Sequence, residues 1–427
     1  MKGVFQLHKH GTTFTKEVVA GLTSFFSIVY IIAVNAKILE DAGIPLEAGI
    51  IATILSSFIG CLLVAFMANV PLIIVPGMGI NALFTYTIVG SMGLHYTVAL
   101  AAVVLSGILF VIVAFTKLST IISDAIPISL KESISVGIGV FIAFIGLHKS
   151  GIVVGNETNF VALGDIASPI VLASFINLVI TLFLFLKKVP GHFLISIILG
   201  TIVAYLFGLV QFSSMDSGFI SFHEYKDVFF SADYSSMLST PFLIACFSFV
   251  LVLIFENIGL VHAQVNGMLK APEKNKKSLE AVSLSTVVCG LFGTSPSVST
   301  VETAAGISAG GRTGLTAVVT GFLFLLSLFF MPFIKLVPEV AIAPILIIIG
   351  AMMLGNIVHI DFSDFTEVFP AFLVIIMIPL TYSIVDGIAF GFIAYPLLKI
   401  FTKKYKQLSI PLCTIALLFL AYFILIA

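Results

Sequence analysis

Long apolar runs separated by short polar loops fill almost the whole sequence. Most runs are about 20 residues long, the length of a helix that crosses about 30 Å of hydrocarbon. The pattern predicts an all-α polytopic membrane protein with about fourteen transmembrane segments, some of them half-helices. The runs are 18–39, 46–68, 71–92, 96–116, 126–147, 168–187, 190–211, 240–261, 279–294, 295–311, 313–335, 338–355, 366–384, 386–401 and 407–426.

Two of the apolar runs are interrupted by proline, glycine and small polar residues. They contain VPGMGINALFTY (75–86) and TSPSVSTVETAAG (294–306). Proline breaks a helix, and irregular backbone is tolerated at membrane depth only where protein or a water-filled cavity surrounds it. We therefore expect a short extended piece followed by a half-helix in each, with free N–H groups facing a cavity. A kink packed against a neighbouring helix is the alternative.

Four polar residues stand out inside the apolar runs, namely Asn35, Asn81, Glu256 and Glu302. The interval from Asn35 to Asn81 equals the interval from Glu256 to Glu302, so one shift of 221 residues relates both pairs. Duplicated halves with a broken helix in each are typical of secondary transporters, which hold substrate near the midplane where the halves meet. An odd number of segments in each half would make the repeats inverted.

The two acids are the strongest candidates for a substrate site. An ionisable residue deep in a membrane segment is costly and indicates a functional site by default. A carboxylate accepts strong hydrogen bonds from N–H groups, and desolvation favours its protonated form, so Glu256 is also the candidate for proton coupling. Its alternative is a structural carboxylate bonded to Asn257. Asn81 is a candidate substrate contact, and Asn35 either orients the site or joins two helices.

Composition excludes several other classes of protein. Hydrophobic residues make up 59% of the chain and charged residues 10%, against about 25% charged in soluble domains. The net charge of −1 argues against a nucleic-acid partner. The four cysteines are far apart, the histidines lack metal-ligand spacing, and no Walker A, HExxH or GxSxG motif occurs. We expect no cofactor, no metal site and no enzymatic activity.

The distribution of charged residues predicts the orientation. Lysines precede the first segment and recur in alternate loops, whereas the loops between are acidic. Because positive residues favour the cytoplasmic side, we expect a cytoplasmic N-terminus in the cell (plasma or inner) membrane, without a cleavable signal. The side of the C-terminus stays open. The basic positions are Lys2, Lys9, Lys16, Lys117, Lys131, Lys187, Lys188, Lys270, Lys274, Lys276 and Lys277, and the acidic ones are Glu40, Asp41, Glu47, Glu224, Asp227 and Asp233.

Several motifs, in order along nearly the whole chain, resemble the AzgA-like hypoxanthine/guanine/adenine permeases of the nucleobase–cation symporter and nucleobase–ascorbate transporter superfamily. They are YIIAVNAKIL (30–39), GMGINALF (77–84), IFENIG (254–259), VETAAGISAGGRTGLTAVVTG (301–321) and PAFLVIIMIPLTYSI (370–384). The resemblance implies fourteen segments in two inverted repeats of seven, with extended pieces in segments 3 and 10. It also implies a core domain of segments 1–4 (14–116) and 8–11 (240–335), and a gate domain of segments 5–7 (126–211) and 12–14 (338–426).

The same resemblance implies import of adenine, guanine or hypoxanthine by proton symport, and often a homodimer. The family's purine-binding acids fall on Glu256 and Glu302, and its GMGxN asparagine falls on Asn81. Gly79 and Thr303, from the same two motifs, complete the predicted substrate-binding set.

Two departures leave the purine preference open. Many members have Asp–Thr at 256–257, and a threonine-rich run followed by Tyr at 296–300. A uracil/xanthine-type carrier or an anion carrier on the same fold is the alternative within transport. A passive channel is the alternative from another class.

Overall fold

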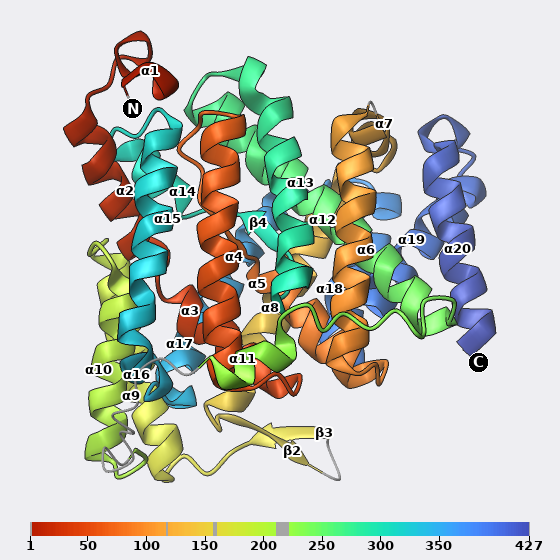
Figure 1. The fold of residues 1–427 in the computed structure, drawn as a ribbon. Coiled ribbons are helices and arrows are strands. Elements are labelled where there is room, and N and C mark those ends of the chain that lie inside the picture. The colour runs from red at the N-terminus through yellow and green to blue at the C-terminus, as the bar shows by residue number, and fades with distance from the viewer. Residues whose placement is uncertain (1, 117, 157–159, 211–221, 427) are drawn as a thin grey trace.

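The computed structural model describes residues 2–116, 118–156, 160–210 and 222–426. Lys117 and position 211, used above for the orientation and for the end of the seventh segment, lie outside these residues. Nine helices in the described part are long and apolar enough to cross a membrane, and three shorter apolar helices accompany them. The helices lie side by side along a common direction (Figure 1). The prediction of an all-α, multi-pass membrane protein is confirmed.

The first half of the chain contains seven segments that alternate in direction. They are α2 (Phe14–Ile28) with α3 (Ile31–Asp41), α4 (Leu46–Met67), the broken segment β1 (Ile74–Pro76), α5 (Met78–Ala82) and η2 (Leu83–Ser91), then α6 (Tyr96–Phe115), α8 (Ile128–Lys149), α9 (Pro169–Leu186) and α10 (His192–Leu206). We call the end of the bundle where α2 begins the amino face, and the end where α3 finishes the far face.

The second half repeats this order from the opposite face. Its segments are α12 (Thr240–His262) with η4 (Ala263–Met268), α13 (Asn275–Phe292), β4 (Ser297–Ser299) with α14 (Thr303–Ser308), α15 (Gly314–Leu326) with η6 (Ser327–Phe330) and α16 (Met331–Lys335), α17 (Glu339–Leu354) with η7 (Gly355–His359), α18 (Phe365–Thr381) and α19 (Ile384–Phe401). Short connecting elements are α1 (Lys2–Phe5), η1 (Leu7–His10), α7 (Leu118–Ala125), β2 (Val153–Asn156), β3 (Phe160–Leu163), α11 (His223–Val228), η5 (Pro272–Lys274) and η8 (Tyr405–Gln407).

The packing of α8 against α17 shows the inverted repeat directly. Both helices begin after a proline, Pro127 and Pro338. They cross closely at Gly139 and Gly350, where a Cβ on Gly139 would lie 2.9 Å from the Gly350 carbonyl oxygen and a Cβ on Gly350 would clash with that of Gly139. A shift of 211 residues relates both the proline pair and the glycine pair. The expected pair of inverted seven-segment repeats is confirmed.

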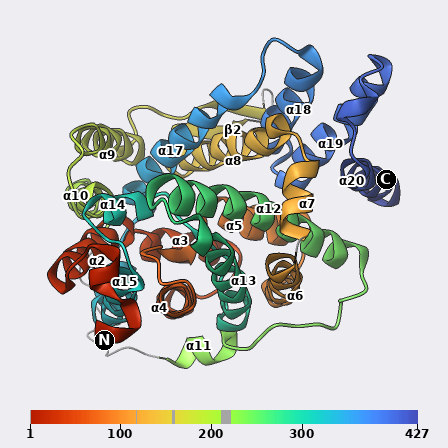
Figure 2. The same cartoon turned by 90° about the horizontal axis from the view of Figure 1, so that it is seen from above.

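The helices pack mainly in two groups. In one group α4 packs on α13 and α15, and α6 packs on α12 and α13. In the other, α8 packs on α17 and α18, while α9 packs on α10 and α18 on α19. Viewed from above, the short helices α5 and α14 lie between these groups (Figure 2). The broken segments are therefore enclosed by helices.

One helix follows the fourteen segments. The range 338–426, for which three segments were predicted, also contains α20 (Ile410–Ile426), which runs antiparallel to α19. The Ser409 hydroxyl donates to the Ala125 carbonyl at its start, and the Tyr422 hydroxyl donates to Asp386 at 2.8 Å near its end. The apolar run of α19 looked too short for a full segment because Lys399 ends it.

Lys399 lies inside the protein rather than at a helix end. Its fully buried ammonium contacts Glu367 at 2.6 Å, the Thr366 hydroxyl at 2.7 Å and Asp364 at 3.6 Å. A buried charge is tolerated when it is paired and hydrogen-bonded. These partners on α18 allow α19 to continue as a helix to Phe401.

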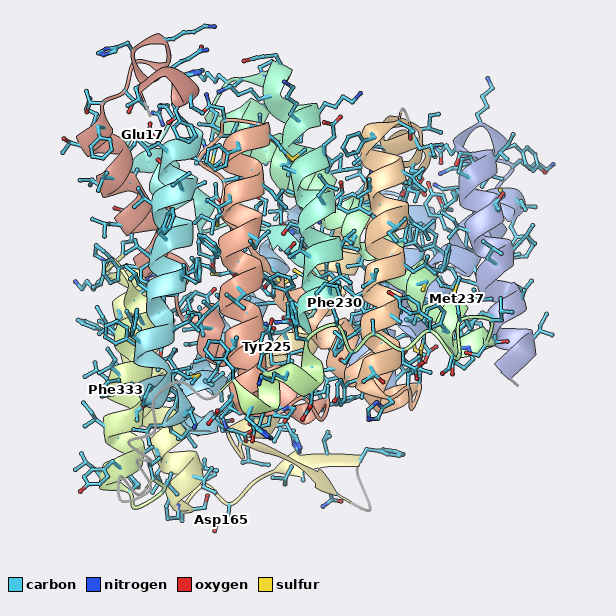
Figure 3. The ribbon with its side chains drawn as sticks, viewed as in Figure 1. Glu17, Asp165, Tyr225, Phe230, Met237 and Phe333 are labelled. Carbon is cyan, nitrogen blue, oxygen red and sulfur yellow. The ribbon has the colours of Figure 1, made fainter. Side chains whose placement is uncertain are left out.

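A buried carboxylate fixes the loop between α14 and α15 at the amino face (Figure 3). Glu17 on α2 accepts hydrogen bonds from the backbone N–H groups of Arg312, Thr313 and Thr316, and from the Thr316 hydroxyl at 2.6 Å. These donors belong to the first turn of α15 and the residues before it, where N–H groups have no partner within the helix. A carboxylate there also interacts favourably with the helix dipole.

Replacing Glu17 by alanine should destabilise the protein by about 3 kcal/mol, because the buried donors would lose their acceptor. Thermal unfolding of the purified protein in detergent measures this loss. The matched control is Glu273→Ala on the exposed surface of the same face, which should change the stability by less than about 0.5 kcal/mol. Equal melting temperatures for the two variants would contradict this role of Glu17.

Candidate functional site

The two broken segments pair with each other in the middle of the bundle. β1 and β4 are antiparallel, with Ile74 opposite Ser299, Val75 opposite Val298 and Pro76 opposite Ser297. All six of these residues are buried. The Gly77 N–H extends the pairing with a bond to the Pro296 carbonyl. This two-stranded ribbon joins the two halves of the chain at a single place.

A short helix begins after each strand and points away from the ribbon. α5 begins at Met78 and contains Asn81, and Glu302 is the residue that precedes α14. Both features were expected from the prolines and glycines of these segments, and the expected extended pieces followed by half-helices are confirmed.

Glu256 lies on α12 beside the start of α5. A Cβ on Gly79 would lie 3.7 Å from Glu256 Oε2. The Glu256 side chain is half-buried and forms no hydrogen bond with any residue that the structure describes. Its neighbour Asn257 is engaged elsewhere, because Nδ2 donates to the Leu253 carbonyl and Oδ1 accepts from the Ser299 N–H. The Glu256 carboxylate is therefore free to accept hydrogen bonds from a ligand.

Glu302 is held by a tyrosine. The Tyr30 hydroxyl, which comes from the break between α2 and α3, donates to Glu302 Oε1 at 2.6 Å. The Glu302 side chain is half-buried, whereas Tyr30 is 2% exposed. One carboxylate oxygen is thus engaged by the Tyr30 hydroxyl, and Oε2 is left for a ligand.

Asn81 has a free donor at the same ribbon. Its Oδ1 accepts a hydrogen bond from the Ser295 hydroxyl, while Nδ2 is buried and has no partner among the described residues. A buried amide without a partner is unfavourable, and such groups are rare in folded proteins. A ligand acceptor at this position would satisfy the Asn81 amide.

Asn35 and Thr303 have their polar atoms engaged within the protein. Asn35 Nδ2 donates to the hydroxyl oxygens of Thr53 at 2.7 Å and Thr294 at 3.0 Å. Thr303 Oγ1 accepts the Ile73 N–H at 3.0 Å. Both side chains are fully buried, so their hydrogen bonds hold the ribbon and its flanks in place. Substrate contact by these two residues stays a prediction.

Three residues that sequence reasoning missed complete the surroundings. Gln264 donates from Nε2 to the Thr300 carbonyl and accepts the Ser299 hydroxyl, which fixes the end of β4. Ile138 on α8 forms a wall beside Gly79, where a Cβ would lie 2.9 Å from Ile138 Cγ2. Tyr30 stands five residues before Asn35 in a motif already singled out, which was the only signal for it in the sequence.

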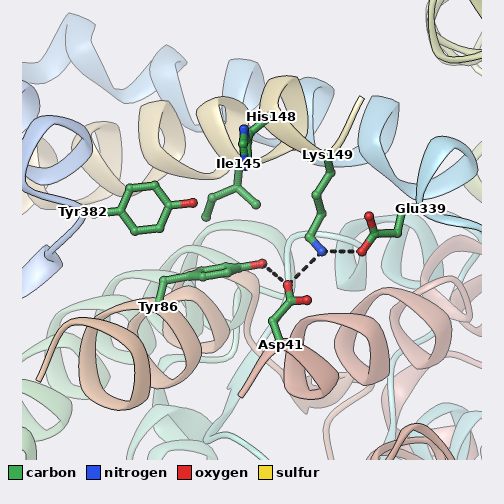
Figure 4. Close-up of a pocket in the computed structure, with 7 residues that line it drawn as sticks. All are labelled: Asp41, Tyr86, Ile145, His148, Lys149, Glu339 and Tyr382. Atoms are coloured by element: carbon green, nitrogen blue, oxygen red, sulfur yellow. Dashed lines mark hydrogen bonds and ion pairs between the residues drawn. The ribbon is translucent and has the colours of Figure 1, made fainter. Parts of the chain in front are cut away.

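The far face of the bundle is closed by side chains from both groups of helices (Figure 4). Lys149 on α8 lies 2.8 Å from Asp41 on α3 and 2.7 Å from Glu339 on α17, and the Tyr86 hydroxyl donates to Asp41 at 2.7 Å. The Tyr382 ring packs edge-on against Tyr86 just beside them.

Two surface cavities flank the bundle. One of about 430 Å³ lies at the far face beside Asp41 and Lys149, and another of about 550 Å³ lies at the amino face beside Asp364 and Glu367. Neither is lined by Glu256 or Glu302. Within the described residues no group of three His, Cys, Asp or Glu side chains is arranged to hold a metal ion.

Residues 15–390 match the sequence profile Xan_ur_permease, described as the Permease family. The chain belongs to this permease family. It is 51% identical over 383 residues to the nucleobase transporter PlAzg2 of Paenibacillus larvae, covering 90% of this chain and 77% of that protein. It is 38% identical to the guanine/hypoxanthine permease PbuO of Bacillus subtilis, covering 97% and 98%. The adenine permease AdeQ of Escherichia coli is 35% identical, covering 99% and 96%.

Solved structures share the permease's fold at low sequence identity. The transmembrane domain of the cyanobacterial bicarbonate transporter BicA superposes with a TM-score of 0.67 at 16% identity, covering 88% of the permease and 97% of that chain. SLC26A9 superposes with a TM-score of 0.63 at 14% identity, covering 91% and 65%. The expected resemblance to AzgA-like permeases is confirmed, and the permease is a multi-pass membrane protein and not an enzyme.

The two asparagines should differ in their effect on the stability of the ligand-free permease. Asn35→Ala removes an amide with two protein acceptors and should destabilise by about 2 kcal/mol. Asn81→Ala removes an amide whose nitrogen has no protein partner and should cost clearly less. Melting temperatures of the two purified variants check this difference, and a larger loss for Asn81→Ala would contradict the hydrogen-bond assignment.

Proposed function

We propose that the permease imports purine nucleobases by proton symport, with adenine, guanine and hypoxanthine as the candidate substrates. The observation that carries the proposal is a set of unsatisfied groups at the β1–β4 ribbon: the Glu256 carboxylate, Glu302 Oε2 and the Asn81 amide nitrogen. The relatives named as guanine/hypoxanthine and adenine permeases support the substrate class.

The free groups match the polar edge of a purine. A purine carries ring N–H groups and ring nitrogen or carbonyl acceptors in one plane. The two carboxylates would accept the N–H groups, and a charged acceptor makes such bonds stronger than neutral ones. The Asn81 amide and the N–H groups at the start of α5 would donate to the acceptors. Gly79, which has no side chain, leaves room for the ring beside Glu256.

Glu256 is the residue that we assign to proton coupling. It has no donor within the described residues, so nothing in the protein holds its charged form. Neutralising a carboxylate at membrane depth removes the cost of a buried charge. A proton on Glu256 would therefore favour the loaded protein and leave with the substrate on the other side.

The two carboxylates disfavour an inorganic anion as substrate, because each would repel it unless protonated. The fold shared with BicA and SLC26A9 therefore does not carry their substrates over to this chain. A passive channel differs in a measurable property, because it cannot accumulate substrate against a gradient. Uptake into energised cells with and without a protonophore separates the two.

We also propose how the helices divide the work. The helices of 14–116 and 240–335 would form the core domain that carries the site. Those of 126–211 and 338–426 would form the gate domain, with α20 following the last repeat segment. Movement of the core against the gate would expose the site alternately at the two faces. The lysines near the N-terminus favour placing the amino face in the cytoplasm of a cell membrane.

Uptake of radiolabelled guanine, hypoxanthine and adenine tests the proposal. Glu256→Gln and Glu302→Gln keep the size of each side chain and remove its charge, so uptake should fall at least about 100-fold, as expected for the loss of charged hydrogen bonds. Membrane abundance, measured in parallel, should stay near that of the wild type. Uptake at wild-type rates in both variants would refute the assignment.

The far-face ion pair should control access from that side. Lys149→Gln leaves Asp41 and Glu339 without their shared cation, so their repulsion should favour opening. An Ile145→Cys variant, whose side chain lines the far-face cavity, should then react several-fold faster with a membrane-impermeant thiol reagent.

The matched control for this experiment is Lys335→Gln, which breaks the pair between Lys335 on α16 and Glu47 on α4. Both residues of that pair belong to the proposed core domain and lie at the same face. The control should leave the reactivity of Ile145→Cys unchanged. Equal reactivity in both backgrounds would mean that the Lys149 pair does not close the far face.

A further inference from the structure

Tyr30 touches one of the two acids and also a helix of the other group. Its hydroxyl donates to Glu302 Oε1 at 2.6 Å, and its ring packs against Phe193 of α10 with ring centres 4.8 Å apart and planes at 68°. Tyr30 and Phe193 are 2% and 3% exposed. Tyr30 is therefore held on both sides, by the acid and by an aromatic ring.

The local sequence explains why Tyr30 can reach Glu302. α2 ends at Ile28 and α3 begins at Ile31, so Tyr30 lies in a break within a single membrane segment. The hydroxyls of Thr23 and Ser27 both bond to carbonyls one turn earlier, a pattern that bends helices. The bend directs Tyr30 toward the residue that precedes α14.

We propose that Tyr30 is a positioning residue for substrate binding, which holds the Glu302 carboxylate in one orientation and leaves its Oε2 for the substrate. The inference rests on the proposed function. A glutamate side chain has several rotatable bonds, and fixing it before the ligand arrives removes part of the entropy cost of binding. The short bond from the Tyr30 hydroxyl supplies this fixation.

The two acids then have different roles. Glu302 is pre-oriented by a donor that also stabilises its charged form, so it acts as the fixed acceptor. Glu256 has no such donor and is free to bind and release a proton. The contact with Phe193 adds a consequence for movement, because α10 belongs to the proposed gate domain. A displacement of α10 would remove the ring that holds Tyr30 and loosen Glu302.

The test is the kinetics of purine uptake by Tyr30→Phe, which keeps the ring and removes the hydroxyl. The apparent KM should rise about 10-fold or more, as expected for loss of a hydrogen bond to a charged group. The maximal rate per transporter should stay within about threefold, because the Phe193 contact remains. A KM within twofold of the wild type would overturn the inference.

Two other tyrosines provide matched controls. Tyr395→Phe removes an equally short bond of 2.6 Å to a carboxylate, Glu367, at the amino face. Tyr225→Phe removes a buried hydroxyl that has no partner among the described residues; Tyr225 lies at the far face (Figure 3). Neither should change KM by more than twofold. A rise in KM equal to that of Tyr30→Phe in either control would show a general loss of structure and overturn the positioning role.

A double-mutant cycle then tests whether the hydroxyl acts through Glu302. Purine-dependent thermal stabilisation should be no weaker in the Tyr30→Phe/Glu302→Gln double variant than in Glu302→Gln alone, because coupled residues are not additive. Additive losses would overturn the inference. Absence of purine uptake by the wild type would instead overturn the proposed function, so the two failures are distinguishable.

Discussion

The pairing of β1 with β4 is the constraint on which the rest of the structure depends. Each strand interrupts a helix at membrane depth, where an unpaired backbone N–H or carbonyl costs several kcal/mol. Neither half of the chain can satisfy its own break. Because each break supplies the partner of the other, the two halves must meet there, and the half-helices α5 and α14 begin at fixed positions on either side.

Polar side chains satisfy the remainder of this region, and what they leave over defines the site. Asn35, Asn257, Gln264 and Thr303 use their polar atoms on the ribbon or its flanks. Such side chains are usually hydrogen-bonded when buried, so an unused group carries information. The unused groups gather where Glu256, Glu302 and Asn81 meet the ribbon, and this makes a planar ligand with mixed donors and acceptors a better match than an ion.

The half-helices could be predicted because proline, glycine and a buried acid in an apolar run are rarely compatible with a continuous lipid-facing helix. The single shift of 221 residues found the repeat only in the segments that carry the site. α8 and α17 are related by 211 residues, since loops of different length separate the two groups of helices. Tyr30 could not be recognised, because an aromatic residue in an apolar run resembles its many neighbours until Glu302, 272 positions away, is placed beside it. Lys399 misled in the same way, since its partners are 32 to 35 positions away.

The far-face ion pair shows how a closed face can open at moderate cost. Removing one partner of a buried ion pair leaves an uncompensated charge, which is strongly unfavourable. Lys149 avoids this because it has two acidic partners, Asp41 on α3 and Glu339 on α17. If α3 moves away from α8 and α17, Lys149 keeps Glu339 and Asp41 keeps the Tyr86 hydroxyl, which comes from the same half-helix segment as Asn81. Both charges stay hydrogen-bonded in either arrangement, so the closed and open states can have similar free energies, as alternating access requires.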